Sequence, residues 1–198
     1  MRSVQLIIGG SPAPWGVTGV SLRTEGDMTF AHTANASLIW PTGDLPSGQL
    51  SIAISGVPKG TEIDGVECAE FVDLPHVAEA DGCFVDHIVL MTNDLDRTCG
   101  SVGEVTGSPL RRVREVGEIR QGFHRIGKGG VIVEVVERAD VSATSLWGFV
   151  LATESFDSVV ADADDLVTEP KSAVQQGRQI STVKSAAGLG VAVALMTV

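Results

Sequence analysis

Apolar and polar residues alternate with a period of two through much of this chain, as in β-strands that bury one face. Lys59 to Gly82 is acidic and contains prolines, and its part DLPHVAEADG (73–82) has the composition of a linker. We therefore expect a β-rich N-terminal region, residues 1–82. Three alternating stretches in it end at Gly or Pro: SVQLIIGG (3–10), MTFAHTANASLIW (28–40) and GQLSIAISGV (48–57).

A different order of elements begins at residue 83. The strand pattern HIVLM (87–91) is followed by a helix candidate, 93–107, that Asn93 or Asp94 can cap. Three strand patterns follow, and the whole order then recurs with WGFVLAT (147–153), a helix candidate at 154–167 and three more strands. Residues 83–198 therefore predict two βαβββ units, 84–140 and 145–198.

The spacing of matching residues supports a duplication. The offset is 61 residues in the first half of each unit and 60 in the last strand, and it changes only across glycine-rich loops. The matches are Asp96 with Asp157, Pro109 with Pro170, Val113 with Val174, and Val131 with Val191.

Composition excludes several classes of protein. The chain has 198 residues, is 43% hydrophobic and carries a formal charge of −11, so nucleic acid would be repelled over most of its surface. No apolar run reaches the roughly 18 to 20 residues of a membrane span, and no signal peptide is visible, so we expect a cytoplasmic protein without membrane partners. The three cysteines (Cys68, Cys83, Cys99) lack ligand spacing and read as reduced thiols.

The paired units, the opening DHIVLMTNDLD and the strand VIVEVVE resemble the vicinal oxygen chelate superfamily, which contains glyoxalase I, extradiol dioxygenases and bleomycin-resistance proteins. The stretches RQGFHRIGKGGVIVEVVE and EPKSAVQQGRQISTV look like an actinobacterial glyoxalase-like branch. This resemblance implies an α+β fold in which two units form a half-open, eight-stranded β-cup that holds a small molecule, with the helices outside. The N-terminal third resembles a degenerate, partial copy of the unit.

Superfamily members that bind a metal carry ligands on the first and last strands of each unit, and His87 and Glu134 occupy these positions in the first unit. A carboxylate among apolar neighbours needs a partner, which predicts a His87–Glu134 pair. The offsets place Gly148 and Ala194 at the matching positions of the second unit, so we expect no cofactor. The pair is then either a general base or a structural remnant. The alternative is a divalent metal such as Zn, Ni, Fe or Mn held by His87 and Glu134.

Four further residues are candidates for ligand binding. Trp147 stands close to a vacant ligand position and could stack on a ligand. Arg120 and Arg178 each begin a strand and could pair with a carboxylate or phosphate, or bridge strand ends instead. His124 is the remaining candidate for the cup, although a structural role is equally open.

These observations predict a small-molecule binding protein or a metal-independent enzyme of the glyoxalase-like type, with the ligand near His87 and Glu134. The first alternative is a metal-dependent lyase, isomerase or dioxygenase of the same superfamily, and the second is a non-catalytic structural or interaction module. Both units lie on one chain, so the cup is complete in a monomer, and we expect a monomer or a homodimer.

Overall fold

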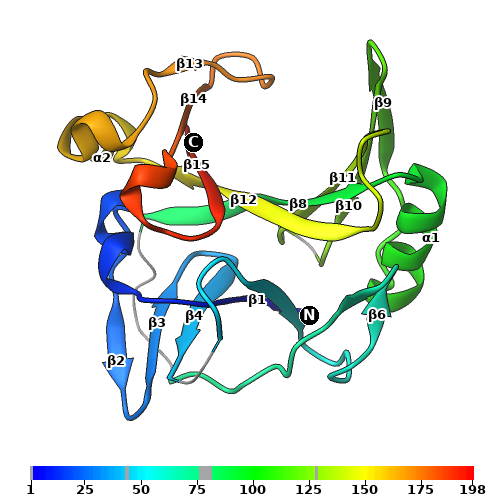
Figure 1. Cartoon of the computed structure of the whole chain (residues 1–198), viewed down its shortest axis with the longest axis horizontal. Helices are drawn as coiled ribbons and strands as arrows, with labels where there is room; N and C mark the ends of the chain where they lie inside the picture. Colours follow the sequence, from blue (N-terminus) through cyan, green and yellow to red (C-terminus); the bar gives the residue numbers. More distant parts are fainter. Residues whose placement is uncertain (1, 43–44, 76–81, 128) are drawn as a thin grey trace.

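The computed structural model describes residues 2–42, 45–75, 82–127 and 129–198. Its centre is an eight-stranded sheet with the strand order β13-β14-β15-β12-β8-β11-β10-β9 (Figure 1). The first unit consists of β8 (Cys83–Thr92), α1 (Leu95–Thr106), β9 (Arg112–Val116), β10 (Ile119–Arg125) and β11 (Ile132–Glu137). The second unit consists of β12 (Ser145–Thr153), α2 (Phe156–Ala163), β13 (Lys171–Ser172), β14 (Gln179–Thr182) and β15 (Ala192–Thr197).

Each unit closes in the same way, because its last strand returns parallel to its first. Ile132 of β11 lies opposite His87 of β8, and Ala192 of β15 lies opposite Gly148 of β12. These two pairs are related by the offsets of 60 and 61 residues in the sequence. The units meet where β8 and β12 pair antiparallel. The expected α+β fold with paired βαβββ units is confirmed.

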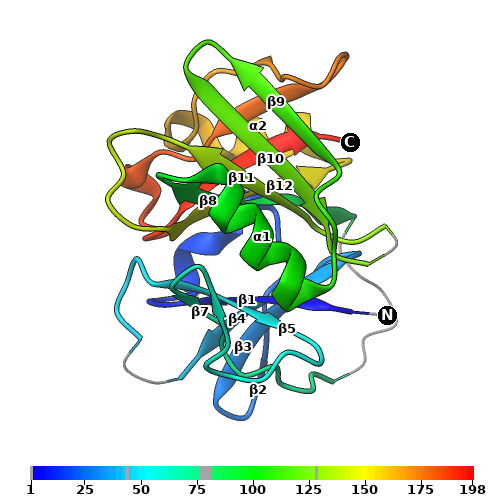
Figure 2. The ribbon, with the colours of Figure 1, turned by 90° about the vertical axis from the view of Figure 1, so that its right-hand side faces the viewer.

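Helix α1 lies on the convex face of this sheet (Figure 2), and α2 packs against β15. The Asp94 side chain caps α1 by accepting a hydrogen bond from the Arg97 amide at 3.0 Å, and Gly107 ends the helix at a φ of 66°. Leu95, Cys99 and other buried residues of α1 share the face that packs on the sheet. No helix among the described residues is both long and apolar enough to cross a membrane.

The N-terminal region repeats the connectivity of a unit in reduced form. Its sheet has the order β2-β3-β4-β1-β5, with β4 parallel to β1, and a 3-10 helix, η1 (Ala13–Thr18), stands where the units have an α-helix. The expected linker, residues 73–82, lies mostly outside the described residues. The strands are β1 (Val4–Ile8), β2 (Arg23–Glu25), β3 (Met28–His32), β4 (Ala36–Pro41) and β5 (Leu50–Ile54), followed by the short pair β6 (Glu62–Ile63) and β7 (Val66–Glu67).

The N-terminal sheet packs under the convex face of the eight-stranded sheet, and one hydrophobic core runs through both (Figure 1). The fully buried ring of Trp15 lies edge-on to Trp40, with centroids 5.0 Å apart, and stacks on Phe149 of β12 at 5.9 Å. Burial of three large aromatic side chains at one junction contributes several kcal/mol to folding. The concave face of the eight-stranded sheet, the cup, stays open.

Candidate functional site

The cup holds a cavity of about 960 Å³ that both units line. The hairpins β9–β10 and β13–β14 rise on the same side of the sheet at its two ends and form the walls (Figure 1). A volume of this size suits a small organic ligand.

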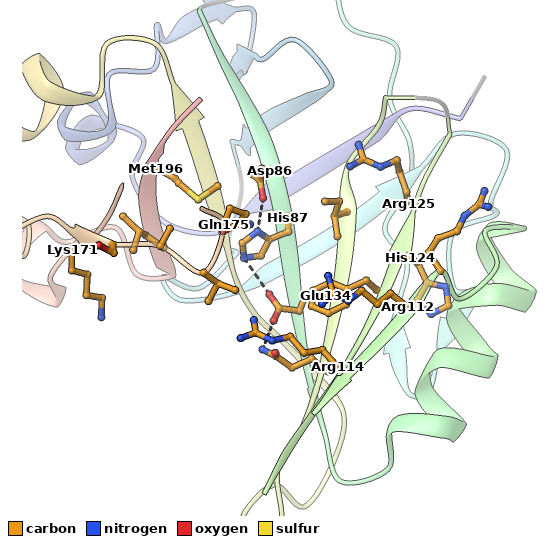
Figure 3. Close-up of a pocket in the computed structure, with 18 residues that line it drawn as sticks. Asp86, His87, Arg112, Arg114, His124, Arg125, Glu134, Lys171, Gln175 and Met196 are labelled. Carbon is orange, nitrogen blue, oxygen red and sulfur yellow. Dashed lines mark hydrogen bonds and ion pairs between the residues drawn. The ribbon is translucent and has the colours of Figure 1, made fainter. Parts of the chain in front are cut away.

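His87 lies on the floor of this cavity between two carboxylates (Figure 3). Its Nδ1 is 2.8 Å from Oδ2 of Asp86, and its Nε2 is 3.2 Å from Oε2 of Glu134. The side chains of His87 and Glu134 are only 15% and 13% exposed, so both interactions are partly shielded from water. The structure thus brings together the two residues on which the sequence-based hypothesis rested.

Two further residues complete this arrangement: Gln121 of β10, and Arg178, which directly precedes β14. Arg178 Nη1 donates to Oδ1 of Asp86 at 2.9 Å, and the Gln121 amide donates to Oε1 of Glu134 at 2.6 Å. We call the set Arg178, Asp86, His87, Glu134 and Gln121 the His87 network. It crosses the cup from the second unit to β10 and fixes the orientation of the imidazole ring.

Asp86 is a part of the site that the sequence did not reveal. Successive side chains of a strand point to opposite faces, so Asp86 and His87 should be separated. In β8, however, Val85 pairs with Leu151 and His87 pairs with Val150, and Asp86 is left over as a β-bulge. The bulge lets two neighbouring side chains hydrogen-bond on the same face. A carboxylate in an otherwise apolar strand was the available signal.

The surroundings shift the pKa of the two carboxyl groups in opposite directions. Burial raises the pKa of Glu134 above its ordinary value, and the nearby charges of His87 and Arg114 offset only part of this effect. Burial also acts to raise the pKa of Asp86, but its hydrogen bonds and charge interactions with His87 and Arg178 hold that pKa below its ordinary value. Asp86 therefore remains an anion, while Glu134 accepts a proton more readily than an exposed carboxylate.

Positive charge surrounds the His87 network. Five of the 14 basic residues of the chain line the cavity, namely Arg111, Arg112, Arg114, Arg125 and Lys171. Among the described lining residues the carboxylates are Asp86 and Glu134, and both are already paired. In a chain with a formal charge of −11, this concentration of cations makes the cup attractive to anions.

Among the other predicted ligand-binding residues, Arg178 belongs to the His87 network, His124 is among the residues that line the cavity, and Arg120 and Trp147 lie elsewhere. Arg120 is on the convex face of β10, where it pairs with Asp96 and with Glu137 at 3.1 Å. His124 shares that face, and its buried Nδ1 is 2.8 Å from the Ser108 carbonyl oxygen. Burial lowers the pKa of His124, which favours the neutral ring. Trp147 is 53% exposed in a second bulge and is not among the residues that line the cavity.

The donor set does not by itself fit a tightly held metal ion. The second unit presents a small apolar cluster of Val150, Ala152 and Met196, with Ile180 and Ala194 packed against it. Its described cavity-lining residues include the polar side chains of Ser172 and Gln175 but no His, Cys, Asp or Glu. The described residues contain no group of three or more His, Cys, Asp or Glu side chains that could hold an ion. Structural and catalytic ions usually have at least three protein ligands.

No family model and no curated protein matches this chain. Among solved structures, methylmalonyl-CoA epimerase from Mycobacterium tuberculosis aligns with a TM-score of 0.51 at 11% identity, covering 62% of this chain and 93% of that one. A Streptomyces coelicolor methylmalonyl-CoA epimerase in complex with 2-nitronate-propionyl-CoA gives a TM-score of 0.48 at 20% identity, covering 57% and 95% of the two chains. A hypothetical protein from Bacillus halodurans gives 0.49 at 12% identity, covering 60% and 96%. The likeness concerns the fold alone: the paired βαβββ units of this chain are arranged as in the protein from Mycobacterium tuberculosis.

Proposed function

We propose that the cup binds an anionic small molecule and that His87 and Glu134 transfer a proton to and from it. The observation that carries this proposal is the His87 network on the floor of a cavity whose walls carry five basic side chains. The side chains of Arg111, Arg112 and Lys171 have no hydrogen-bond acceptor or ion-pair partner among the described residues. These cations are therefore available to a carboxylate or phosphate of a ligand.

The chemistry follows from the 3.2 Å approach of Nε2 of His87 to Oε2 of Glu134. Asp86 holds the Nδ1 hydrogen and favours the orientation in which Nε2 faces Glu134. The pKa of Glu134 is raised by burial and so lies closer to neutral pH, where a general base works best. A C–H group next to a carbonyl of an anchored ligand would lose its proton to this pair and regain it, on the same or the other face.

The fold comparison favours turnover over binding alone. The neighbour from Mycobacterium tuberculosis is described as an epimerase that acts on methylmalonyl-CoA, an anionic thioester. This agrees with the first alternative drawn from the sequence, a metal-dependent lyase, isomerase or dioxygenase, better than with a binding protein or a metal-independent enzyme. An acyl-CoA thioester or a small dicarboxylate is accordingly our first choice of ligand.

Binding is tested by calorimetric titration with CoA, a CoA thioester, malonate and inorganic phosphate. We expect at least one anion to bind, and we expect Arg112→Met and Lys171→Met to weaken that binding by about tenfold each, as for one lost charge-assisted contact. Arg23→Met, which removes an exposed cation on β2 outside the cup, is the matched control. Equal affinity in all three variants would contradict the proposed binding site.

Turnover is tested by NMR in D₂O with the ligand that binds. The protein should exchange the C–H group next to the carbonyl for deuterium, and Glu134→Gln, which keeps the shape of the side chain but cannot accept the proton, should slow exchange by about 10²-fold or more. His87→Gln should have a similar effect. Exchange at the wild-type rate in both variants would show that neither His87 nor Glu134 transfers the proton.

The absence of a tightly held ion stays a prediction, because His87 and Glu134 alone are too few ligands. Metal analysis of the purified protein, before and after incubation with Zn²⁺, Ni²⁺, Fe²⁺ or Mn²⁺ and gel filtration, measures it directly. Less than about 0.2 equivalents is expected for such a two-ligand set. A stoichiometric ion that is lost in Glu134→Gln would instead establish the metal-dependent alternative.

A further inference from the structure

The strand that carries His87 is incompletely paired at its beginning. Strand β11 pairs with β8 only from His87 onward, so the edge of Val85 and Asp86 that faces away from β12 has no strand neighbour among the described residues. The bulge at Asp86 lies within this segment. An unpaired edge next to a bulge leaves the backbone free to change its register, which would move Asp86 and His87 to other faces.

The N-terminal region supplies the missing partner for this edge. The Asn35 side chain makes two hydrogen bonds to the backbone of Val85, and we call this pair of bonds its grip on Val85. Its Nδ2 donates to the Val85 carbonyl at 2.9 Å, and its Oδ1 accepts from the Val85 amide at 2.9 Å. The Ala34 amide adds a third bond to the Cys83 carbonyl at 2.9 Å. An amide side chain that makes both bonds reproduces the hydrogen-bond pattern of a neighbouring strand.

The turn that carries Asn35 is itself held firmly. It connects β3 to β4, and three hydrogen bonds between Thr33 and Ala36 bridge it. The Thr33 amide and the Thr33 hydroxyl donate to the Ala36 carbonyl at 2.9 and 3.0 Å, and the Ala36 amide donates to the Thr33 hydroxyl at 3.1 Å. The turn therefore presents the Asn35 amide to Val85 in a fixed orientation. Val85 is the residue directly before the bulge.

We propose that Asn35 is a positioning residue for the site: its grip on Val85 fixes the bulge that places Asp86 and His87 together on the floor of the cup. The N-terminal region thereby positions the site of the C-terminal units. The effect on chemistry rests on the proposed function, in which His87 is the reacting group. Asn35 acts through the backbone of Val85, which is one residue from Asp86 and two from His87.

The test compares two amides that make the same pair of bonds in different places. Asn35→Leu removes the grip on Val85, whereas Gln5→Leu removes an equivalent grip on the Val72 backbone, with bonds of 2.7 and 3.0 Å, that touches no part of the site. Urea denaturation should show a loss of stability in both variants. The ring-nitrogen NMR shifts of His87, assigned by their disappearance in His87→Gln, should move in Asn35→Leu and stay unchanged in Gln5→Leu.

These shifts are read without a ligand, so their outcome is independent of the proposed function. Where exchange activity is present, Asn35→Leu should lower it by about tenfold or more, as for a misplaced catalytic group, and Gln5→Leu should leave it unchanged at a temperature where both are folded. If Asn35→Leu does not fold, Asn35→Ser, which also loses the paired grip, gives the same readout. His87 shifts like those of the wild type in a folded Asn35 variant would overturn the proposal.

Discussion

At the scale of single residues, the coupling between His87 and Glu134 predicts how their substitutions combine. His87→Leu leaves the half-buried carboxylates of Asp86 and Glu134 without the bond that each makes to the ring, which should cost about 1–3 kcal/mol of unfolding free energy. Glu134→Leu removes one charge and leaves His87 paired with Asp86, so it should cost less. The double substitution should cost less than the sum of the two, because Glu134 is no longer left unpaired.

Equilibrium denaturation in urea at pH 7 of the two single variants and the double variant measures this coupling. Phe30→Leu, a conservative core change in the N-terminal sheet, combined with His87→Leu is the control and should give additive losses, because Phe30 shares no contact with the site. Strict additivity for His87 and Glu134 as well would show that the 3.2 Å contact contributes nothing to stability.

The His87–Glu134 pair was predictable because the resemblance to the superfamily places both residues at ligand positions and because a carboxylate among apolar neighbours needs a partner. Strand alternation explains why Arg120 and His124 lie on the convex face: each is one residue away from a residue, Gln121 or Phe123, that faces the cup. Asp86 could not be predicted, because a bulge adds one residue to a strand without any mark in the sequence.

At the scale of elements, Asp64 fastens the β6–β7 hairpin to the first unit. Its carboxylate accepts hydrogen bonds from the hydroxyls of Thr98 and Thr144 and pairs with Arg97 at 2.7 Å, and Arg97 and the two hydroxyls hold its pKa at about 2 although burial acts to raise it. Its own amide donates to Ser101 of α1 at 2.8 Å. The hairpin and α1 therefore share one polar junction, built around a single anion.

A pKa that is lowered on folding makes stability depend on pH with a definite sign. Asp64 contributes its full stabilisation above its ordinary pKa of 3.8 and loses it as the pH falls towards about 2. Asp64→Asn, which tolerates the φ of 49°, should cost about 1–2 kcal/mol at pH 7 and flatten the loss of stability between pH 4 and pH 2. Denaturation midpoints from pH 2 to pH 7 measure both effects.

Asp140→Asn is the control for Asp64→Asn. Asp140 also pairs with an arginine, Arg138, but at an exposed position where the pair contributes little. An equal flattening in both variants would show that the acid sensitivity of the protein arises elsewhere. The duplicated units were predictable because their helices and most of their strands are long enough to show a period, whereas β6, β7 and β13, with two residues each, are too short.

At the scale of the whole molecule, the N-terminal sheet is a further layer that packs on the eight-stranded sheet and shares its hydrophobic core. The sequence indicated its strands and its likeness to a partial unit, but no pattern could show which face of the larger sheet it covers. The stacked rings of Trp15 and Phe149 and the grip of Asn35 on Val85 show that it closes the convex face from below. Long-range packing of this kind depends on side chains that meet across 50 or more residues of sequence.

This arrangement predicts that residues 83–198 do not form a stable protein alone, although they contain both units. Without the N-terminal region, Phe149 and Leu151, each 1% exposed, and Val85, 0% exposed, would face water on the convex side. Exposure of three such side chains costs about 5–9 kcal/mol, at roughly 1.5–3 kcal/mol each, which is comparable to the whole stability of a domain of this size. Expressed alone, the fragment should be insoluble or bind a dye specific for exposed apolar surface, whereas co-expression with residues 1–82 should restore a soluble complex. A fragment that is soluble alone and unfolds cooperatively at the midpoint of the full chain would show that the shared core is dispensable.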